Sequence, residues 1–181
     1  MDFGRVLEAV LTRFHEQHIR YAALGGFALG LWGAPRATQD LDFLVHCDDV
    51  GDVHRILTAL GYERHFSSEN ASQYRSPIAP LGAIDILYAS RMPSLRMLER
   101  TQKRPVQGSQ LQIHVLLPED IIGFKVQAMA NNPARIKHEQ VDIESLMQAH
   151  RGQLDWERIQ QYYEIFNLSD EGRALRSKYE I

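Results

Sequence analysis

Apolar residues recur along this chain with two different periods, one typical of helices and one of strands. Val6, Leu7, Val10, Leu11 and Phe14 follow helical spacing, whereas the short apolar run before Gly25 is typical of a buried strand. The first third is expected to form a helix over 3–18, a strand over 19–24, a short helix over 27–32, a strand over 40–45 and a helix over 49–60.

The remaining pattern predicts a change of architecture near residue 117. Weaker strands are expected over 62–66 and 73–76, a strong strand over 83–88, a helix over 93–103, a turn at Gln107-Gly108-Ser109 and a strand over 111–116. From Pro118 onward the pattern is helical, with breaks near 131–133, 152 and 167–169. The predicted fold class is therefore α/β (α+β): a small mixed sheet flanked by helices over 1–117, followed by a helical C-terminal region over 118–181.

Composition places this architecture in a single globular protein. The 181 residues are 44% hydrophobic, with 20 basic and 23 acidic side chains and a net charge of −3, which is enough apolar matter for a core. The single cysteine, Cys47, excludes an internal disulfide and a Cys-x-x-Cys zinc site, so a reducing, cytoplasmic location is expected. No signal peptide is apparent, and the nearly apolar stretch 21–34 is shorter than the roughly 20 residues of a membrane span.

Two carboxylates stand in the expected strand over 40–45. Because side chains alternate across a sheet, Asp40 and Asp42 share one face, while Leu41 and Phe43 point to the other. Their Cα atoms are separated by roughly 6.6 Å, and two like charges at that distance repel unless a cation lies between them. Mg²⁺ favours such carboxylates together with substrate phosphate, although an exposed strand face would explain the same pattern.

A third carboxylate, Asp85, interrupts the apolar strand over 83–88. A charge there needs a pair, a hydrogen bond or a metal, so the alternatives are a structural acid paired with an arginine and a metal ligand. If the strands of Asp40 and Asp85 are neighbours, the three carboxylates meet on one face. Two metal ions about 3.5–4 Å apart could then activate a nucleophile and stabilise a leaving pyrophosphate.

Gly25-Gly26 ends a strand and opens a short helix. Glycines at such a position let the backbone approach a ligand, and the free N–H groups of a helix start favour phosphate. A Gly-Gly pair alone is more often a plain turn. Its position within eighteen residues of Asp40 and Asp42 makes the pattern more specific.

Leu24-Gly25-Gly26 followed by Arg36-Ala37-Thr38-Gln39-Asp40-Leu41-Asp42-Phe43 resembles the motif of the polymerase-β-like nucleotidyltransferase superfamily. The Arg-x-Thr-x-Asp-Leu-Asp form is most similar to the AbiEii/AbiGii toxin-like branch of bacterial toxin–antitoxin and phage-defence systems. The resemblance implies that Gly25 and Gly26 hold nucleotide phosphates and that Asp40 and Asp42 bind Mg²⁺, with Mn²⁺ as the alternative ion. It also implies that Asp85 is a third metal ligand or the base that activates the acceptor, with two ions in the site.

Three basic or hydroxyl side chains are further candidates for nucleotide binding. Arg36 and Thr38 precede the strand of Asp40 and would reach a triphosphate if their loop folds over it; otherwise they are a loop residue and a strand-entry residue. Lys125 could meet phosphate from its helix, and the alternative is a lysine at the edge of a core face.

The sequence thus predicts a Mg²⁺-dependent enzyme that moves an NMP from an NTP to an acceptor. The resemblance implies RNA, such as a tRNA 3′ end, or a protein as acceptor, and a toxin controlled by a cognate antitoxin. A basic stretch over 91–104 could guide RNA, or it could be a solvated face. Two alternatives stay open: nucleotidylation of a small molecule of the antibiotic type, and a catalytically inactive nucleotide-binding regulatory module.

Overall fold

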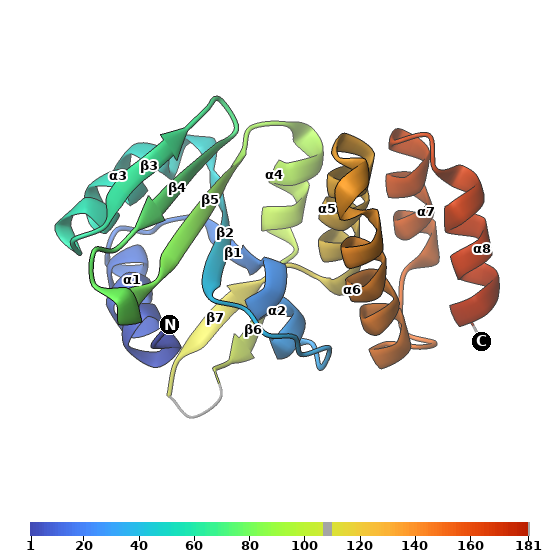
Figure 1. The fold of residues 1–181 in the computed structure, drawn as a ribbon, viewed down its shortest axis with the longest axis horizontal. Coiled ribbons are helices and arrows are strands. Elements are labelled where there is room, and N and C mark those ends of the chain that lie inside the picture. Colours follow the sequence, from blue (N-terminus) through green and yellow to red (C-terminus); the bar gives the residue numbers. More distant parts are fainter. Residues whose placement is uncertain (107–109, 181) are drawn as a thin grey trace. The chain divides into compact units, whose positions relative to one another are not determined.

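The computed structural model describes residues 1–106 and 110–180, so the predicted turn at Gln107-Gly108-Ser109 lies outside the described residues. The chain divides into two compact units. The first unit comprises Met1–Leu31 and Arg36–Leu116, and the second comprises Trp32–Pro35 and Leu117–Ile181. Figure 1 shows their helices and strands along the sequence.

The first unit is built on a seven-stranded mixed sheet with the order β3-β4-β5-β2-β1-β7-β6, as the mixed α/β pattern predicts. The strands are β1 (Tyr21–Leu24), β2 (Asp40–His46), β3 (Glu63–Ser67), β4 (Ala71–Arg75), β5 (Ala83–Ala89), β6 (Gln102–Pro105) and β7 (Gln112–Val115). Strands β2 and β5 are parallel neighbours, as are β1 and β7, and the other neighbouring pairs are antiparallel. The helices of this unit are α1 (Phe3–Glu16), α2 (Gly25–Leu31), α3 (Val50–Ala59) and α4 (Met92–Glu99).

Alternation along β2 decides which face of the sheet enters the core. Leu41 and Phe43 are fully buried, and the Phe43 ring packs edge-on against Phe14 of α1 and Tyr21 of β1. Because neighbouring residues of a strand point to opposite faces, Asp42 is directed away from this aromatic cluster. The apolar core therefore orients the acidic face.

Two predicted boundaries are wrong for physical reasons. The helix expected over 93–103 ends at Glu99, and Gln102–Pro105 forms strand β6 instead, with Lys103 opposite His114 of β7. Hydrogen bonds between β6 and β7 satisfy backbone N–H and C=O groups that would otherwise be satisfied within a longer helix. Helix α2 begins at Gly25, two residues before the expected start at residue 27, so the Gly25-Gly26 pair opens the helix as its first turn.

The second unit contains four helices in its described part: α5 (Pro118–Asn131), α6 (Ile136–Ala149), α7 (Trp156–Ile165) and α8 (Ser169–Tyr179). Helix α5 packs against α6 and α7, and α7 packs against α8. Inside this unit the Tyr162 hydroxyl donates a 2.6 Å hydrogen bond to the buried Asp120 carboxylate. Among the described residues, no helix is both long and apolar enough to cross a membrane.

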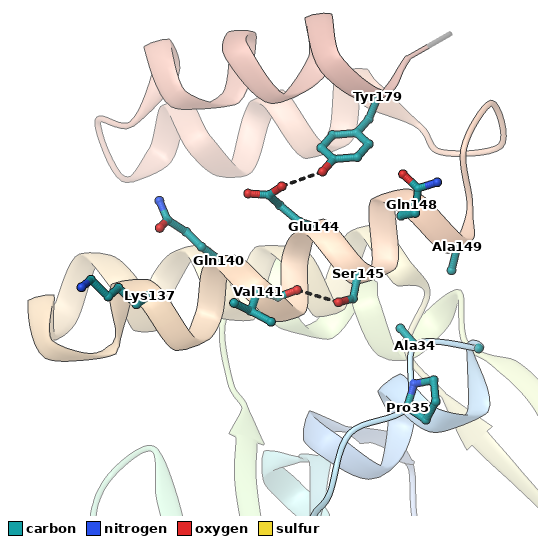
Figure 2. A pocket seen from close by; sticks show the side chains of 11 residues that line it. Ala34, Pro35, Lys137, Gln140, Val141, Glu144, Ser145, Gln148, Ala149 and Tyr179 are labelled. Atoms are coloured by element: carbon teal, nitrogen blue, oxygen red, sulfur yellow. Dashed lines mark hydrogen bonds between the residues drawn. The ribbon is translucent and has the colours of Figure 1, made fainter.

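The outer face of α6 lines an open groove of about 900 Å³. Figure 2 shows Glu144 on this face accepting a hydrogen bond of 2.6 Å from the Tyr179 hydroxyl. Lys178 donates a second bond of 2.6 Å to the same carboxylate oxygen of Glu144. The negative charge of Glu144 is therefore compensated by Lys178 of the same unit.

Candidate active site

Strands β2 and β5 bring two aspartates face to face. In their parallel pairing Asp42 lies directly opposite Asp85, and Asp40 lies two residues earlier on the same strand. Directly paired residues of neighbouring strands point to the same face, so all three carboxylates belong to one face of the sheet. Both Asp42 and Asp85 are half-buried, whereas Asp40 is exposed.

The surroundings of Asp85 oppose the negative charge of its carboxylate. Burial raises the pKa of the Asp85 carboxyl, and the nearby Asp40 carboxylate raises it further. A 3.3 Å hydrogen bond from the Gln73 amide and the positive charge of Arg75 act in the opposite direction. The balance still disfavours the charged form of Asp85, which is the condition that a bound cation would relieve.

The Gly25-Gly26 pair fits closely around the acidic strand. Gly25 has a positive φ of 67°, and a Cβ added there would overlap the Asp42 carboxylate. A Cβ added at Gly26 would lie 2.9 Å from Thr38 and 3.1 Å from the Arg36 guanidinium. Atoms of the candidate site itself therefore exclude a side chain at Gly25 and leave room for one at Gly26 only if Thr38 shifts.

The loop before β2 holds the two remaining candidates of the first unit. The Thr38 hydroxyl donates to the Asp40 carbonyl at 3.3 Å, and the Arg36 guanidinium donates to the Ala37 carbonyl at 3.4 Å. Their side chains also lie beside Gly26. The structure thus gathers Gly25, Gly26, Arg36 and Thr38 with Asp40, Asp42 and Asp85 in one unit.

A family model for proteins described as uncharacterised nucleotidyltransferases matches residues 4–171. The chain belongs to this family. The mixed sheet with flanking helices is the fold of solved nucleotidyltransferases, and the family identifies the chain as a transferase enzyme. No curated protein matches it in sequence.

Three solved structures illustrate the shared nucleotidyltransferase fold. ANT(2″)-Ia, in complex with adenylyl-2″-tobramycin, is 14% identical at a TM-score of 0.67, with 90% of this chain and 95% of that chain covered. A nucleotidyltransferase-like antigen of Paracoccidioides brasiliensis is 18% identical at a TM-score of 0.59, covering 99% and 94%. The lincosamide antibiotic adenylyltransferase LnuA, bound to lincomycin, is 13% identical at a TM-score of 0.53, covering 78% and 94%.

Lys125 of this nucleotidyltransferase belongs to the helical unit and is engaged there. Its ammonium donates to Glu139 at 2.9 Å and to Asp142 at 2.5 Å. The lysine, glutamate and aspartate are only 6%, 1% and 4% exposed. Two buried carboxylates therefore use the charge that a phosphate contact would need.

Sequence reasoning missed Gln73 as a neighbour of the acidic face. Gln73 lies opposite Asp85 in the β4–β5 pairing and donates the hydrogen bond described above. The available signal was the alternation of Gln73 and Arg75 with the buried Tyr74 in a strand predicted over 73–76. That alternation places both polar side chains on one face, but it does not reveal which strand lies next to it.

A separate group of ligand-type atoms lies at the other end of β2. In the part of the chain that the structure describes, His46, Cys47 and Asp48 form a group whose ligand atoms all lie within 4.8 Å of one another. In residues 1–106 and 110–180, Asp40, Asp42 and Asp85 do not make up a group of this compactness. Carboxylates are nevertheless the ligand type that Mg²⁺ prefers, since it takes one or two of them and completes its coordination with water and substrate phosphate.

Proposed function

We propose that this nucleotidyltransferase moves an NMP from an NTP to an acceptor hydroxyl and releases pyrophosphate, with Mg²⁺ held on the acidic face. The observation that carries the proposal is the direct pairing of Asp42 with Asp85 beside the obligatory Gly25. Three carboxylates, one of them with a raised pKa, form a donor set that fits a hard divalent cation. Mn²⁺ shares the preference for carboxylate oxygen and is the expected substitute.

Asp40 and Asp42 would hold the metal, and Asp85 would accept the proton of the acceptor hydroxyl or add a third ligand. When bound, Mg²⁺ supplies positive charge that stabilises the phosphate oxygens and the leaving pyrophosphate. Asp85 suits the role of base because burial and Asp40 already raise its affinity for a proton. The Gln73 amide fixes one oxygen of Asp85 by its hydrogen bond.

The nucleotide phosphates would lie along Gly25 and Gly26. Since neither residue carries a side chain, a phosphate can approach the backbone there closely. Arg36 would add positive charge, because its guanidinium already lies next to Gly26, and Thr38 would donate its hydroxyl from the same side. Lys125 would take part only if its buried ion pairs were broken, so we assign it no phosphate contact.

For the acceptor, we propose a small molecule with a free hydroxyl group. The chain spans 95% and 94% of the length of two antibiotic adenylyltransferases that share its fold. The basic stretch over 91–104 is divided between α4 and the edge strand β6, which gives no continuous basic helix for an RNA backbone. These observations favour the small-molecule alternative over the RNA or protein acceptor that the sequence resemblance implies.

The RNA hypothesis remains the second candidate, because Arg91 and Arg96 are exposed on or beside α4. Under that hypothesis the chain is a toxin of the AbiEii/AbiGii type with a cognate antitoxin. Its expression should then arrest growth, and Asp42→Asn should relieve the arrest. Growth that is unaffected by the active protein contradicts the toxin role.

A labelling experiment tests both the chemistry and the acceptor. The protein is incubated with Mg²⁺ and each α-labelled NTP, in separate reactions with total RNA, a protein lysate, and a panel of hydroxylated antibiotics and metabolites. We expect transfer to a small molecule by the wild type and none by Asp42→Asn, while Asp48→Asn, which removes an exposed carboxylate from the same chain, stays active. Transfer by Asp42→Asn would overturn the metal assignment, and label in RNA would select the second candidate. Binding of NTP without any transfer would instead identify an inactive regulatory module.

A further inference from the structure

A cavity of about 430 Å³ lies in the first unit, between α1, the start of β1 and the β6–β7 pair. Its size is within the range of small-molecule sites, about 300–1,000 Å³. The apolar part of its wall includes the buried side chains of Leu11, Phe14 and Ile19. A cavity of about 150 Å³ accommodates benzene, so this one has room for an aromatic ring with a short chain.

This cavity lies on the side of the sheet opposite the acidic face. Tyr21 lines it and packs edge-on against Phe14 and Phe43, with ring centroids 5.1 Å and 5.7 Å away. Phe43 points away from the face of Asp42, because neighbouring residues of a strand alternate between the two faces. The cavity is therefore distinct from the candidate active site.

Lys103 and His114 provide polar groups at the wall of the cavity. The two residues are paired directly across β6 and β7, so their side chains share one face. Lys103 is exposed and forms no ion pair with a carboxylate in residues 1–106 and 110–180. The half-buried His114 ring packs edge-on against Tyr21, with ring centroids 5.7 Å apart. Both side chains are accessible to a group that enters the cavity.

The described lining of the cavity carries positive charge. None of its members is an aspartate or a glutamate, and Lys103 contributes a full positive charge. Burial raises the pKa of the Tyr21 hydroxyl to about 12, so this group stays uncharged at neutral pH. Burial, and then the charge of Lys103, lower the pKa of His114, so its ring is mostly neutral at pH 7. The lining thus attracts an anion and offers one lysine to pair with it.

We propose that this cavity binds a small aromatic carboxylate. The ring of the ligand lies against the apolar wall, and its carboxylate accepts a hydrogen bond from the Lys103 ammonium. The His114 Nδ1 lies 3.1 Å from the Thr101 hydroxyl, and with that hydroxyl as donor the Nε2–H of His114 is free to donate to the carboxylate. The single negative charge of the ligand matches the single lysine, whereas an amine of the same size would be repelled.

Binding of 3-phenylpropionate to the full chain, measured by calorimetry and by two-dimensional NMR, tests the proposal. The carboxylate should bind saturably, and the backbone signals that shift should include those of Lys103 and His114. The neutral 3-phenylpropanamide should bind about three- to tenfold more weakly, and 2-phenylethylamine at least about tenfold more weakly. Lys103→Met should weaken the carboxylate by about three- to tenfold, the range of one hydrogen bond. Lys137→Met, which removes an exposed lysine outside the lining, should leave binding unchanged.

A second variant addresses the cavity itself. Thr12 of α1 lines it, so Thr12→Phe should fill part of the space and weaken carboxylate binding by about tenfold or more. Ser177→Phe is the matched control, because Thr12 and Ser177 are both exposed helical residues whose hydroxyl donates to the carbonyl four residues earlier, at 2.7 Å and 3.0 Å. Ser177 lies outside the lining, so its replacement should leave binding unchanged. Asp42→Asn should also bind the carboxylate normally, since the proposed transfer chemistry is not involved.

Three results would overturn the proposal. They are the absence of saturable binding of 3-phenylpropionate, equal binding of 2-phenylethylamine, and carboxylate binding that both Lys103→Met and Thr12→Phe leave intact. The second would mean that the charge of the lining does not select the ligand. The third would place the carboxylate elsewhere on the protein.

Discussion

The ion pairs of Lys125 make a direct test of whether this lysine serves the fold or the nucleotide. Lys125→Met keeps an unbranched side chain of similar length and removes the charge. Glu139 and Asp142 would then be two buried carboxylates that have lost their shared ammonium. The variant should fold less stably, because an uncompensated buried charge is costly.

The structure sets the size of the loss. Removing one partner of a buried ion pair costs about 3–5 kcal/mol. Arg135 contacts the other oxygen of Glu139 from a half-exposed position and keeps part of the compensation, which favours the lower end of that range. With about 2–4 °C of Tm per kcal/mol for a chain of this length, a loss of about 3 kcal/mol lowers Tm by about 6–12 °C.

The loss of stability in Lys125→Met should also depend on pH. Burial would raise the pKa of Glu139, but hydrogen bonding and charge from Lys125, together with Arg135, bring the pKa below its ordinary value. Such a group adds stability above its unfolded pKa of about 4.3 and loses this contribution as pH falls through the lower folded value. Without Lys125, burial would instead favour protonation in the folded state. The Tm difference between the variant and the wild type should therefore be largest at pH 7 and narrow toward pH 4.

Thermal melts by circular dichroism at pH 7 and pH 4 measure the Tm difference between Lys125→Met and the wild type. The KM for NTP is measured for both proteins at a temperature well below Tm. Lys137→Met, which removes the charge of an exposed lysine on the same helix as Glu139, is the matched control and should change stability by less than about 0.5 kcal/mol. The reasoning is refuted by a Lys125→Met protein that melts like the wild type and has a raised KM for NTP. That result would return Lys125 to the nucleotide site.

Four further outcomes are expected. Asp85→Asn should lower kcat by about 10²-fold or more with little change in KM for NTP, since a base acts in the transition state; unchanged kcat in steady-state assays contradicts the role. EDTA should abolish transfer and Mg²⁺ should restore it, so activity that persists in EDTA excludes the metal proposal. Gly25→Ala should lower Tm and activity together, because its φ is positive and a Cβ would overlap Asp42; a wild-type melt and rate would refute this. Tyr162→Phe should cost about 1–3 kcal/mol in chemical unfolding, because it removes the hydrogen bond to buried Asp120, and a change below about 0.5 kcal/mol would contradict it.

Much of the first unit could be predicted because its strands are buried and alternate. Leu41 and Phe43 had to face a core, which directed Asp40 and Asp42 to the other face whatever the neighbouring strands were. The pairing of Asp42 with Asp85, by contrast, is a contact between residues distant in sequence. From the sequence, this pairing could be expected only if the strands of Asp40 and Asp85 were neighbours. The structure shows that these two strands, β2 and β5, are parallel neighbours.

The misassigned segment after Glu99 shows why local pattern was insufficient there. Gln102, Lys103 and Arg104 are compatible with a helix, so propensity alone extends α4 through them. Their strand state depends on a partner across the chain, where Lys103 lies opposite His114 and the Thr101 hydroxyl is 3.1 Å from the His114 ring nitrogen. Tertiary pairing of this kind overrides a weak local preference.

Lys125, in the helical unit, shows the same limit. Its sequence context, a lysine among apolar residues of a helix, is equally consistent with a phosphate contact and a buried ion pair. Its partners in the structure, Glu139 and Asp142, lie on another helix at positions that reach α5 only after the two helices pack. Side-chain chemistry alone therefore could not separate the two roles.

The position of Asp42 explains how the fold protects the geometry of its candidate site. Asp42 lies opposite Leu24 of β1 on one side and Asp85 of β5 on the other, so two ladders fix it along the strand. A slip of β2 by one residue would bury Asp42 and expose Phe43, at a cost of several kcal/mol from the buried charge and the lost apolar contacts. The residues that hold the register are thus the apolar neighbours of the acids. We therefore expect Phe43→Ala to disturb metal binding as well as stability, although its ring lies on the opposite face.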